Sequence, residues 1–160
     1  MDIKSPNRAQ QYLEQRAWGA YIALTCQPEA LFDLLVAAQA QQLSDEDIKA
    51  LNKRLKWQIE NLNCSLRYVT INLIEAKLIV FVDGSFANNK DLSSQLGFIL
   101  MLVNKSANTN TFIIRGNVIY YSSTKCKRVT RSVLASEIYS MVNGFHIGIA
   151  ITTTLRIVTK

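Results

Sequence analysis

The sequence predicts an α/β protein of the α+β type, in which a helical first part is followed by a small mixed sheet with one packed helix. Two observations support this prediction. Apolar residues recur at helical spacing up to about residue 62, whereas from residue 65 they alternate or form short continuous runs typical of strands. Helical spacing then returns after residue 132. We therefore expect two domains, a helical segment over residues 1–63 and a domain built around the sheet over residues 64–160.

Composition limits the class of protein. The chain has 160 residues, of which 49% are hydrophobic and 19% charged, and this balance is typical of a globular protein. No uninterrupted apolar run is long enough to span a bilayer and the polar N-terminus lacks a signal core, so we expect neither a membrane partner nor secretion. Three scattered cysteines and a single histidine form no metal or disulfide pattern, which indicates a reduced intracellular setting in cytoplasm or nucleus.

Charge is distributed unevenly along the chain. Residues 1–76 carry 8 basic and 9 acidic side chains, whereas residues 77–160 carry 10 basic and 3 acidic ones. The positive excess in the second part would attract a polyanion such as nucleic acid. A basic surface can also serve solubility alone, so charge by itself leaves both interpretations open.

Three helices are predicted in the first part. The first runs from Ala9 to Leu24, and the second begins at Pro28, where a proline in the first turn suits a helix start. The third follows Ser44, a residue able to cap a helix, with three acidic residues directly after it. Its predicted apolar stripe consists of Ile48, Leu51, Leu55, Ile59 and Leu62.

Four strands and a helix are predicted in the second part. The predicted strands are Ser65–Leu73, Lys77–Asp83, Gln95–Val103 and Thr111–Tyr121. The continuous apolar run within Lys77–Asp83 is typical of a strand that is buried on both faces. From Ser132 onward a helix is expected, because apolar residues again follow helical spacing. These residues are Val133, Leu134, Ile138, Met141 and Val142.

Two carboxylates occupy unusual positions for charged side chains. Asp83 ends an apolar strand, which places it at the rim of the sheet, and Glu137 lies in the last helix among apolar and small residues. A glutamate on the apolar side of a helix is costly unless it is paired or bound to a metal ion. Converging carboxylate oxygens are the ligands that Mg²⁺ prefers. The plainer alternatives are a strand-end cap for Asp83 and a solvent-facing position for Glu137.

Four short motifs follow one another in the second part of the chain. They are Leu78–Ala87, Asp91–Phe98, Tyr121–Lys125 and Arg131–Tyr139. In order and spacing they resemble the ribonuclease H domain of copia-type LTR-retrotransposon polyproteins. The helical first part, with its Ala20–Glu29 segment, is similar to the reverse transcriptase thumb and connection segment that precedes this domain. The resemblance covers about residues 12–150.

The resemblance implies an enzyme that cuts the RNA strand of an RNA–DNA hybrid with two Mg²⁺ ions. It implies that Asp83 is the catalytic metal ligand on the first strand and that Glu137 is the catalytic metal ligand on the helix. On the loop after Asp83, we also expect Asn88, Asn89 and Ser94 to reach a sugar or phosphate. Substrate phosphates would be held by four basic residues just before the helix, namely Lys125, Lys127, Arg128 and Arg131.

The chain departs from the family pattern after Glu137. The family places at least a third carboxylate on a later strand, but the 23 residues after Glu137 contain no Asp or Glu. Two carboxylates hold a metal pair poorly, so we expect a truncated domain with little or no nuclease activity of its own. Without the family's parallel strand, Leu78–Val82 would form an unpaired apolar edge, which favours self-association.

Two other classes of protein remain open. One is a nucleic-acid-binding remnant without catalysis, whose binding of hybrid would depend on salt but not on Mg²⁺. The other is a protein-interaction module in which both carboxylates are incidental. A polymerase is excluded for this chain, because the sequence contains no Tyr-x-Asp-Asp turn.

Overall fold

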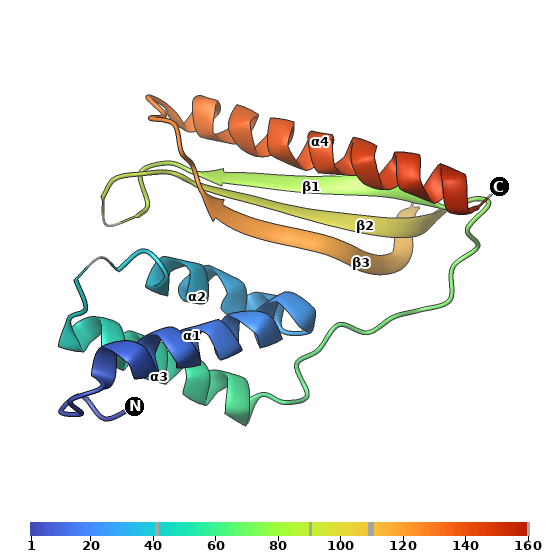
Figure 1. The fold of residues 1–160 in the computed structure, drawn as a ribbon. Coiled ribbons are helices and arrows are strands. Elements are labelled where there is room, and N and C mark those ends of the chain that lie inside the picture. Colours follow the sequence, from blue (N-terminus) through green and yellow to red (C-terminus); the bar gives the residue numbers. More distant parts are fainter. Residues whose placement is uncertain (41, 90, 109–110, 160) are drawn as a thin grey trace. The chain divides into compact units, whose positions relative to one another are not determined.

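The chain folds into two compact units of different architecture (Figure 1). The computed structural model describes residues 1–40, 42–89, 91–108 and 111–159. The first unit, Met1–Leu66, is helical, and the second, Arg67–Lys160, combines a three-stranded sheet with one helix. The predicted mixed class of helices and strands is therefore confirmed.

The first unit is built from short helices around a small apolar core. They are α1 (Arg8–Thr25), the 3-10 helix η1 (Pro28–Ala30), α2 (Leu31–Ala37) and α3 (Asp45–Glu60). Leu34, Ile48 and Leu51 are buried in this core. The predicted stripe on α3 is wrong in its second half, because Ile59 and Leu62 are 70% and 77% exposed. The helix ends at Glu60, and the buried position in its last turns belongs to a glutamine instead.

That glutamine, Gln58, replaces apolar packing with hydrogen bonds. Its amide nitrogen donates to the carbonyl oxygen of Gly19 at 3.1 Å. Its own backbone carbonyl accepts a bond of 3.3 Å from the side chain of Gln27. These bonds connect α3 to Gly19 of α1 and to Gln27 just after α1, and they satisfy the amide nitrogens. The amide oxygens of both glutamines are buried without a hydrogen-bond partner among the described residues.

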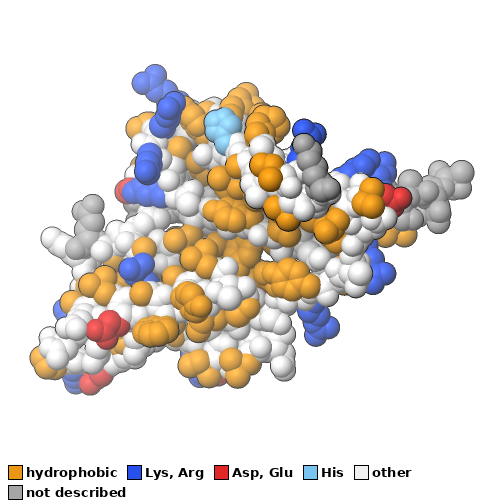
Figure 2. Space-filling view, turned by 45° about the vertical axis from the view of Figure 1, so that its right-hand side comes forward, with side chains coloured by type: hydrophobic (Ala, Val, Ile, Leu, Met, Phe, Trp, Pro, Cys, Tyr) orange, Lys and Arg blue, Asp and Glu red, His pale blue; other side chains and the backbone are white. Residues whose placement is uncertain are grey.

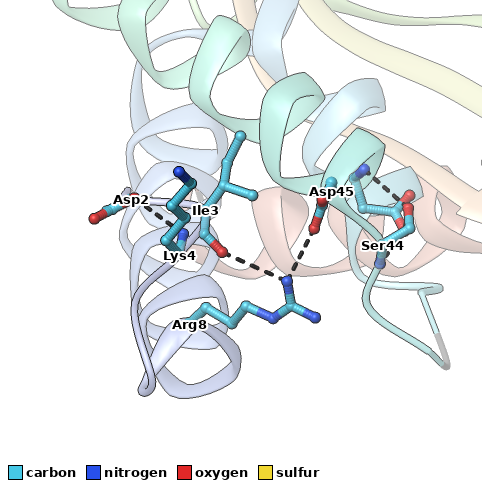
Figure 3. A network of polar contacts seen from close by, with 7 residues as sticks. Asp2, Ile3, Lys4, Arg8, Ser44 and Asp45 are labelled. Atoms are coloured by element: carbon cyan, nitrogen blue, oxygen red, sulfur yellow. Dashed lines mark hydrogen bonds and ion pairs between the residues drawn. The ribbon is translucent and has the colours of Figure 1, made fainter.

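The start of α3 has the cap that the sequence predicts (Figure 3). The backbone nitrogen of Asp47 donates to Oγ of Ser44, and Ser44 N donates back to the Asp47 carboxylate at 3.1 Å. This reciprocal pair satisfies two donors that a helix start otherwise leaves free. Nearby, Arg8 bonds both the carbonyl of Ile3 and the carboxylate of Asp45, the latter at 2.9 Å. Arg8 thereby connects α1 to the start of α3 and to the N-terminal segment.

The sheet of the second unit is antiparallel throughout its described strands. Its order is β1 (Lys77–Ser85), β2 (Gln95–Asn108) and β3 (Thr111–Lys125). The predicted strand Ser65–Leu73 is wrong, because this segment forms no ladder with the sheet. Its backbone bonds asparagine side chains instead, with Val69 paired to Asn117 at 2.7 and 2.9 Å.

Helix α4 (Val133–Val158) covers one face of the sheet, over β1 and β2. It packs through a stripe of small buried residues, Ser136, Ser140, Gly144 and Gly148. A Cβ atom at Gly144 would lie 2.9 Å from a methyl group of Val80, so the helix comes as close as a glycine allows. The large apolar residues that predict this helix in the sequence are therefore exposed rather than buried.

One expectation about an apolar segment fails in the second unit. The strand over Lys77–Asp83 is confirmed, but Phe81 and Val82 are 46% and 37% exposed, so it is not buried on both faces. Within the second unit α4 covers only the face to which Val82 belongs, which leaves Phe81 uncovered, and Val82 itself lies on an edge strand. Helix α4 is long and apolar enough to cross a membrane by length and composition only, which is weak evidence, so the expectation of no membrane partner stays a prediction. Its serines and glycines interrupt the apolar run, which is why the sequence shows no continuous span.

Candidate functional site

The register of the sheet brings distant parts of the second unit to one end. Gln95, the first residue of β2, lies opposite Ser85 at the end of β1 and opposite Lys125 at the end of β3. The first turns of α4 meet the same end, because Oγ of Ser136 donates to the carbonyl of Gly84 at 3.2 Å (Figure 1). The motifs that the sequence separates therefore share one rim, which we call the sheet end.

Both predicted carboxylates lie at the sheet end. Asp83 is exposed near the end of β1, and its carbonyl oxygen accepts a bond of 2.8 Å from Oγ of Ser140. Glu137 is half-buried on α4, and its carboxylate accepts a bond of 3.1 Å from the backbone nitrogen of Gly84. Glu137 is therefore neither fully exposed to solvent nor a buried charge without a hydrogen-bond partner. The structure places it beside the residue that follows Asp83.

The close approach of α4 and β1 depends on one glycine between these carboxylates. A Cβ atom at Gly84 would lie 2.6 Å from the backbone carbonyl of Ser136 and 2.7 Å from the nitrogen of Glu137. No side chain fits into this space, so helix and strand touch through their backbones. Gly84 thus determines how near the helix carboxylate comes to the strand.

The donor set at the sheet end suits one hydrated cation better than a metal pair. Among the described residues, no group of three or more His, Cys, Asp or Glu side chains could hold a metal. Mg²⁺ is commonly held by one or two carboxylates, water and a substrate phosphate. Glu137 on α4 and Asp83 on the face of β1 away from α4 could each provide one carboxylate. Two-metal chemistry needs more oxygen ligands than these two side chains supply.

The basic segment between β3 and α4 is fixed to the same end of the sheet. The backbone nitrogen of Cys126 donates to the carbonyl oxygen of Ser94 at 2.8 Å. The hydroxyl groups of Ser94 and Thr130 are hydrogen-bonded to one another. Two anchors therefore hold the segment that carries Lys127 and Arg128 next to the start of β2.

The four basic residues predicted to hold phosphate differ in their surroundings. All four are exposed. Lys125 forms an ion pair with Asp91, and the guanidinium of Arg128 stacks on the ring of Tyr139, 5.6 Å from its centre. Lys127 and Arg131 form no ion pair with the described residues. These last two are the residues most available to a phosphate, while Arg128 is held in a fixed orientation.

Asp91 is the third acid of the second part of the chain, and it serves the loop rather than the carboxylate pair. Its carboxylate accepts bonds from Lys125 and from Oγ of Ser93, the latter at 2.6 Å. The Lys125 ammonium, followed by the Ser93 hydroxyl, holds the pKa of Asp91 well below its usual range. The aspartate thus stays ionised and keeps Lys125 pointing along the loop.

For two of the three loop residues, the prediction that they reach a sugar or phosphate is wrong. Asn89 and Ser94 are buried, and Asn89 donates to Oγ of Ser93 at 3.0 Å inside the loop. Their hydrogen bonds stabilise the loop. Ala87 and Leu92 in this loop adopt left-handed backbone angles, with φ of 51° and 60°, and side-chain hydrogen bonds help to maintain such angles. Asn88 is exposed.

Sequence reasoning missed Asp91 and Tyr139 as part of this site. Asp91 lies 34 positions before Lys125, so no local pattern reveals their pairing. Tyr139 lies two residues after Glu137. Its contact with Arg128 could have been suggested only by the presence of a tyrosine close to a cluster of arginines and lysines.

Comparison with models of known protein families, with curated proteins and with solved structures gave no match for this chain. The assignment of a function therefore depends on the residues and geometry described above.

Proposed function

We propose that the second unit binds RNA–DNA hybrid or a related nucleic acid at the sheet end, as a ribonuclease H-like domain of a copia-type retrotransposon polyprotein. The observation that supports this proposal most directly is the shared rim. The register at Gln95 brings the end of β1, which carries Asp83, to the same end of the sheet as the basic segment after β3, and α4 with Glu137 begins there. A phosphate backbone held by the basic residues would then pass close to the carboxylates.

Two residues would carry most of the phosphate binding. Lys127 and Arg131 are exposed and form no ion pair with the described residues, so binding a phosphate costs them no existing partner. Arg128 would add a cation whose orientation is already set by Tyr139. Contacts of this kind position a nucleic acid without reading its sequence, and their strength falls as salt rises.

The carboxylates would hold one Mg²⁺ ion and would not cleave the bound strand by themselves. Bound Mg²⁺ would neutralise a phosphate that otherwise repels Asp83 and Glu137. The half-buried carboxylate of Glu137, oriented by Gly84 N, would be the direct ligand, and the exposed Asp83, on the face of β1 away from α4, would contact the ion through water. Cleavage by the family's mechanism needs a further carboxylate, which the described residues do not bring to this place.

Binding of a fluorescently labelled RNA–DNA hybrid at several salt concentrations tests the interface. For the variant Lys127→Ala/Arg131→Ala, we expect weaker binding and a salt slope reduced by about 1 for each residue. The matched control is Arg115→Ala/Arg156→Ala, which removes two exposed cations from the opposite end of the second unit. Equal losses in both variants, or no binding by the wild type, would contradict the proposal.

The role of the carboxylates is tested by adding Mg²⁺ at constant ionic strength. We expect Mg²⁺ to tighten hybrid binding by the wild type and to have little effect on Asp83→Asn/Glu137→Gln. Without Mg²⁺ the double variant should bind hybrid more tightly than the wild type, because two repelling charges are gone. The same Mg²⁺ response in both proteins would place the ion elsewhere.

A further inference from the structure

We propose that two copies of this chain associate through the free edge of β1, in a symmetric antiparallel pair centred on Val80. This association needs no nucleic acid. It uses Asp83, which the proposed function assigns to Mg²⁺, so the dimer and the ion would compete for this carboxylate. Three independent observations support it, namely an unpaired strand edge, a charge pattern along that strand, and an exposed apolar flank of the helix above it.

One edge of β1 is not paired with any described strand. The sheet order is β1-β2-β3, and β1 pairs only with β2 among the described strands. All nine residues, Lys77–Ser85, lie opposite a partner on β2, so the strand is regular and unbroken by a bulge. Along Lys77–Val82 its other side presents free backbone donors and acceptors, and it carries neither a proline nor a bulge that would block another strand. At Asp83 and Gly84 the backbone already bonds side chains of α4.

The charges on β1 are complementary to themselves. In an antiparallel pair centred on Val80, Lys77 of one copy lies opposite Asp83 of the other, and the symmetry produces this ion pair twice. Both side chains are exposed, and neither forms an ion pair within the described part of its own chain. They lie on the same face of the strand, because residues alternate and Val80 and Val82 point toward α4. Any shift of register would lose both ion pairs.

The apolar flank of α4 overhangs the same edge. On one flank of the helix Tyr139 contacts Arg128 in the segment that follows β3, whereas Glu137, on the side of Met141, accepts a hydrogen bond from Gly84 N of β1. The opposite flank therefore lies above the free edge of β1. Its residues are Met141, Phe145 and Ile149, which are 53%, 61% and 51% exposed. Side chains of this size gain free energy when a second surface covers them. The space-filling view shows how widely apolar side chains reach the surface on the face that it presents (Figure 2).

Strand pairing would bring the two helices to a normal packing distance. The glycines of α4 contact β1 through Val80 and β2 through Phe98 and Leu100, so the helix axis runs between these two strands. With strands about 4.8 Å apart, the two α4 axes of the pair would lie about 10 Å from each other. Helices in proteins pack at about 8–10 Å, so the exposed flanks would meet without a gap or a clash.

Sedimentation velocity of the full chain tests this proposal, without Mg²⁺ or nucleic acid and with a reductant for the three cysteines. We expect a monomer–dimer equilibrium that weakens at high salt. The single reversals Lys77→Asp and Asp83→Lys should each raise the dimer Kd about tenfold, because each replaces two ion pairs with two like-charged pairs. The double variant Lys77→Asp/Asp83→Lys restores both pairs with exchanged signs and should return the Kd close to that of the wild type.

The control variants separate this interface from other causes. Lys53→Asp reverses an exposed charge in the first unit and should leave the Kd unchanged. Phe145→Gln should weaken the dimer without altering the circular dichroism of the monomer. A wild type that stays monomeric at every concentration overturns the proposal. A dimer that neither single reversal weakens, or that the double variant fails to restore, overturns the register centred on Val80. Recovery in the double variant also shows that neither substitution prevents folding.

Discussion

Helix α4 has a buried face of small residues and an exposed flank of large apolar residues, which is the reverse of what hydropathy alone predicts. The face toward the sheet consists of Ser136, Ser140, Gly144 and Gly148, all buried, whereas the outer flank with Phe145 and its apolar neighbours is exposed. The buried face consists of small side chains rather than large apolar ones, and small side chains allow the helix backbone and the side chains of the sheet to approach closely. Side-chain size therefore decides which face of this helix packs on its own sheet. The large apolar residues are left exposed on the outer flank.

The largest effect on the packing of the buried face is expected at Gly84, where the helix touches the strand through backbone atoms. Gly84→Ala should destabilise the second unit by about 3 kcal/mol, since its Cβ would overlap the backbone of Ser136. The matched control is Gly97→Ala on the neighbouring strand, where a Cβ finds ordinary contacts of 3.5 and 4.0 Å. Its effect should stay below about 1 kcal/mol. Hydrogen exchange of the β1 and β2 amides measures both values.

Hydrogen exchange is the appropriate probe because it separates the two units. Both tryptophans, Trp18 and Trp57, belong to the first unit, so tryptophan fluorescence does not report on the sheet. Equal losses of protection in the two alanine variants would contradict the role given to Gly84.

Adjacent positions on α4 provide the second test. Gly144→Ala adds one methyl group toward Val80 and Val82, at 2.9 and 3.0 Å, and should destabilise the second unit by about 1–2 kcal/mol. Phe145→Gln removes a whole ring from the exposed flank and should change the stability of the monomer by less than about 1 kcal/mol. Both are measured at protein concentrations where the chain is monomeric. The larger loss in Phe145→Gln would show that the flank is packed within one chain.

Two hydrogen bonds of the same type give the smallest contrast. Ser140 donates from the buried face to the carbonyl of Asp83, and Asn143 donates from an exposed position to the carbonyl of Tyr139. Ser140→Ala should cost about 1 kcal/mol, because a buried bond is lost. Asn143→Ala should cost almost nothing, since water replaces the lost bond. Comparable costs in both variants would mean that the Ser140 bond contributes nothing through its burial.

The parts of the fold that the sequence predicted well depend on local chemistry. The cap of Ser44 on α3 and the apolar run of β1 are decided by residues within a few positions of each other. The errors concern contacts between distant residues. Ser65–Leu73 alternates like a strand, yet Val69 and Asn72 bond the side chains of Asn117 and Asn104, which lie 48 and 32 positions away. Hydropathy could not reveal the buried face of α4, because that face is made of serine and glycine.

The candidate site shows the same division between local and distant information. Asp83 at a strand end and Glu137 in a helix were predictable as isolated positions. Their meeting through Gly84 depends on the packing of α4 against β1, which no spacing in the sequence encodes. The separation of the basic residues into paired Lys125 and unpaired Lys127 follows from a loop contact with Asp91, and it became visible only in the structure.

Incubation of a labelled RNA–DNA hybrid with and without Mg²⁺, following both binding and strand length, tests the central claim most directly. We expect the wild type to bind the hybrid, more tightly with Mg²⁺, and to leave the RNA strand intact, with Asp83→Asn losing the Mg²⁺ response. Mg²⁺-dependent cleavage that disappears in Asp83→Asn would contradict the claim that two carboxylates are insufficient. Absence of binding by folded protein would contradict the nucleic-acid interface itself.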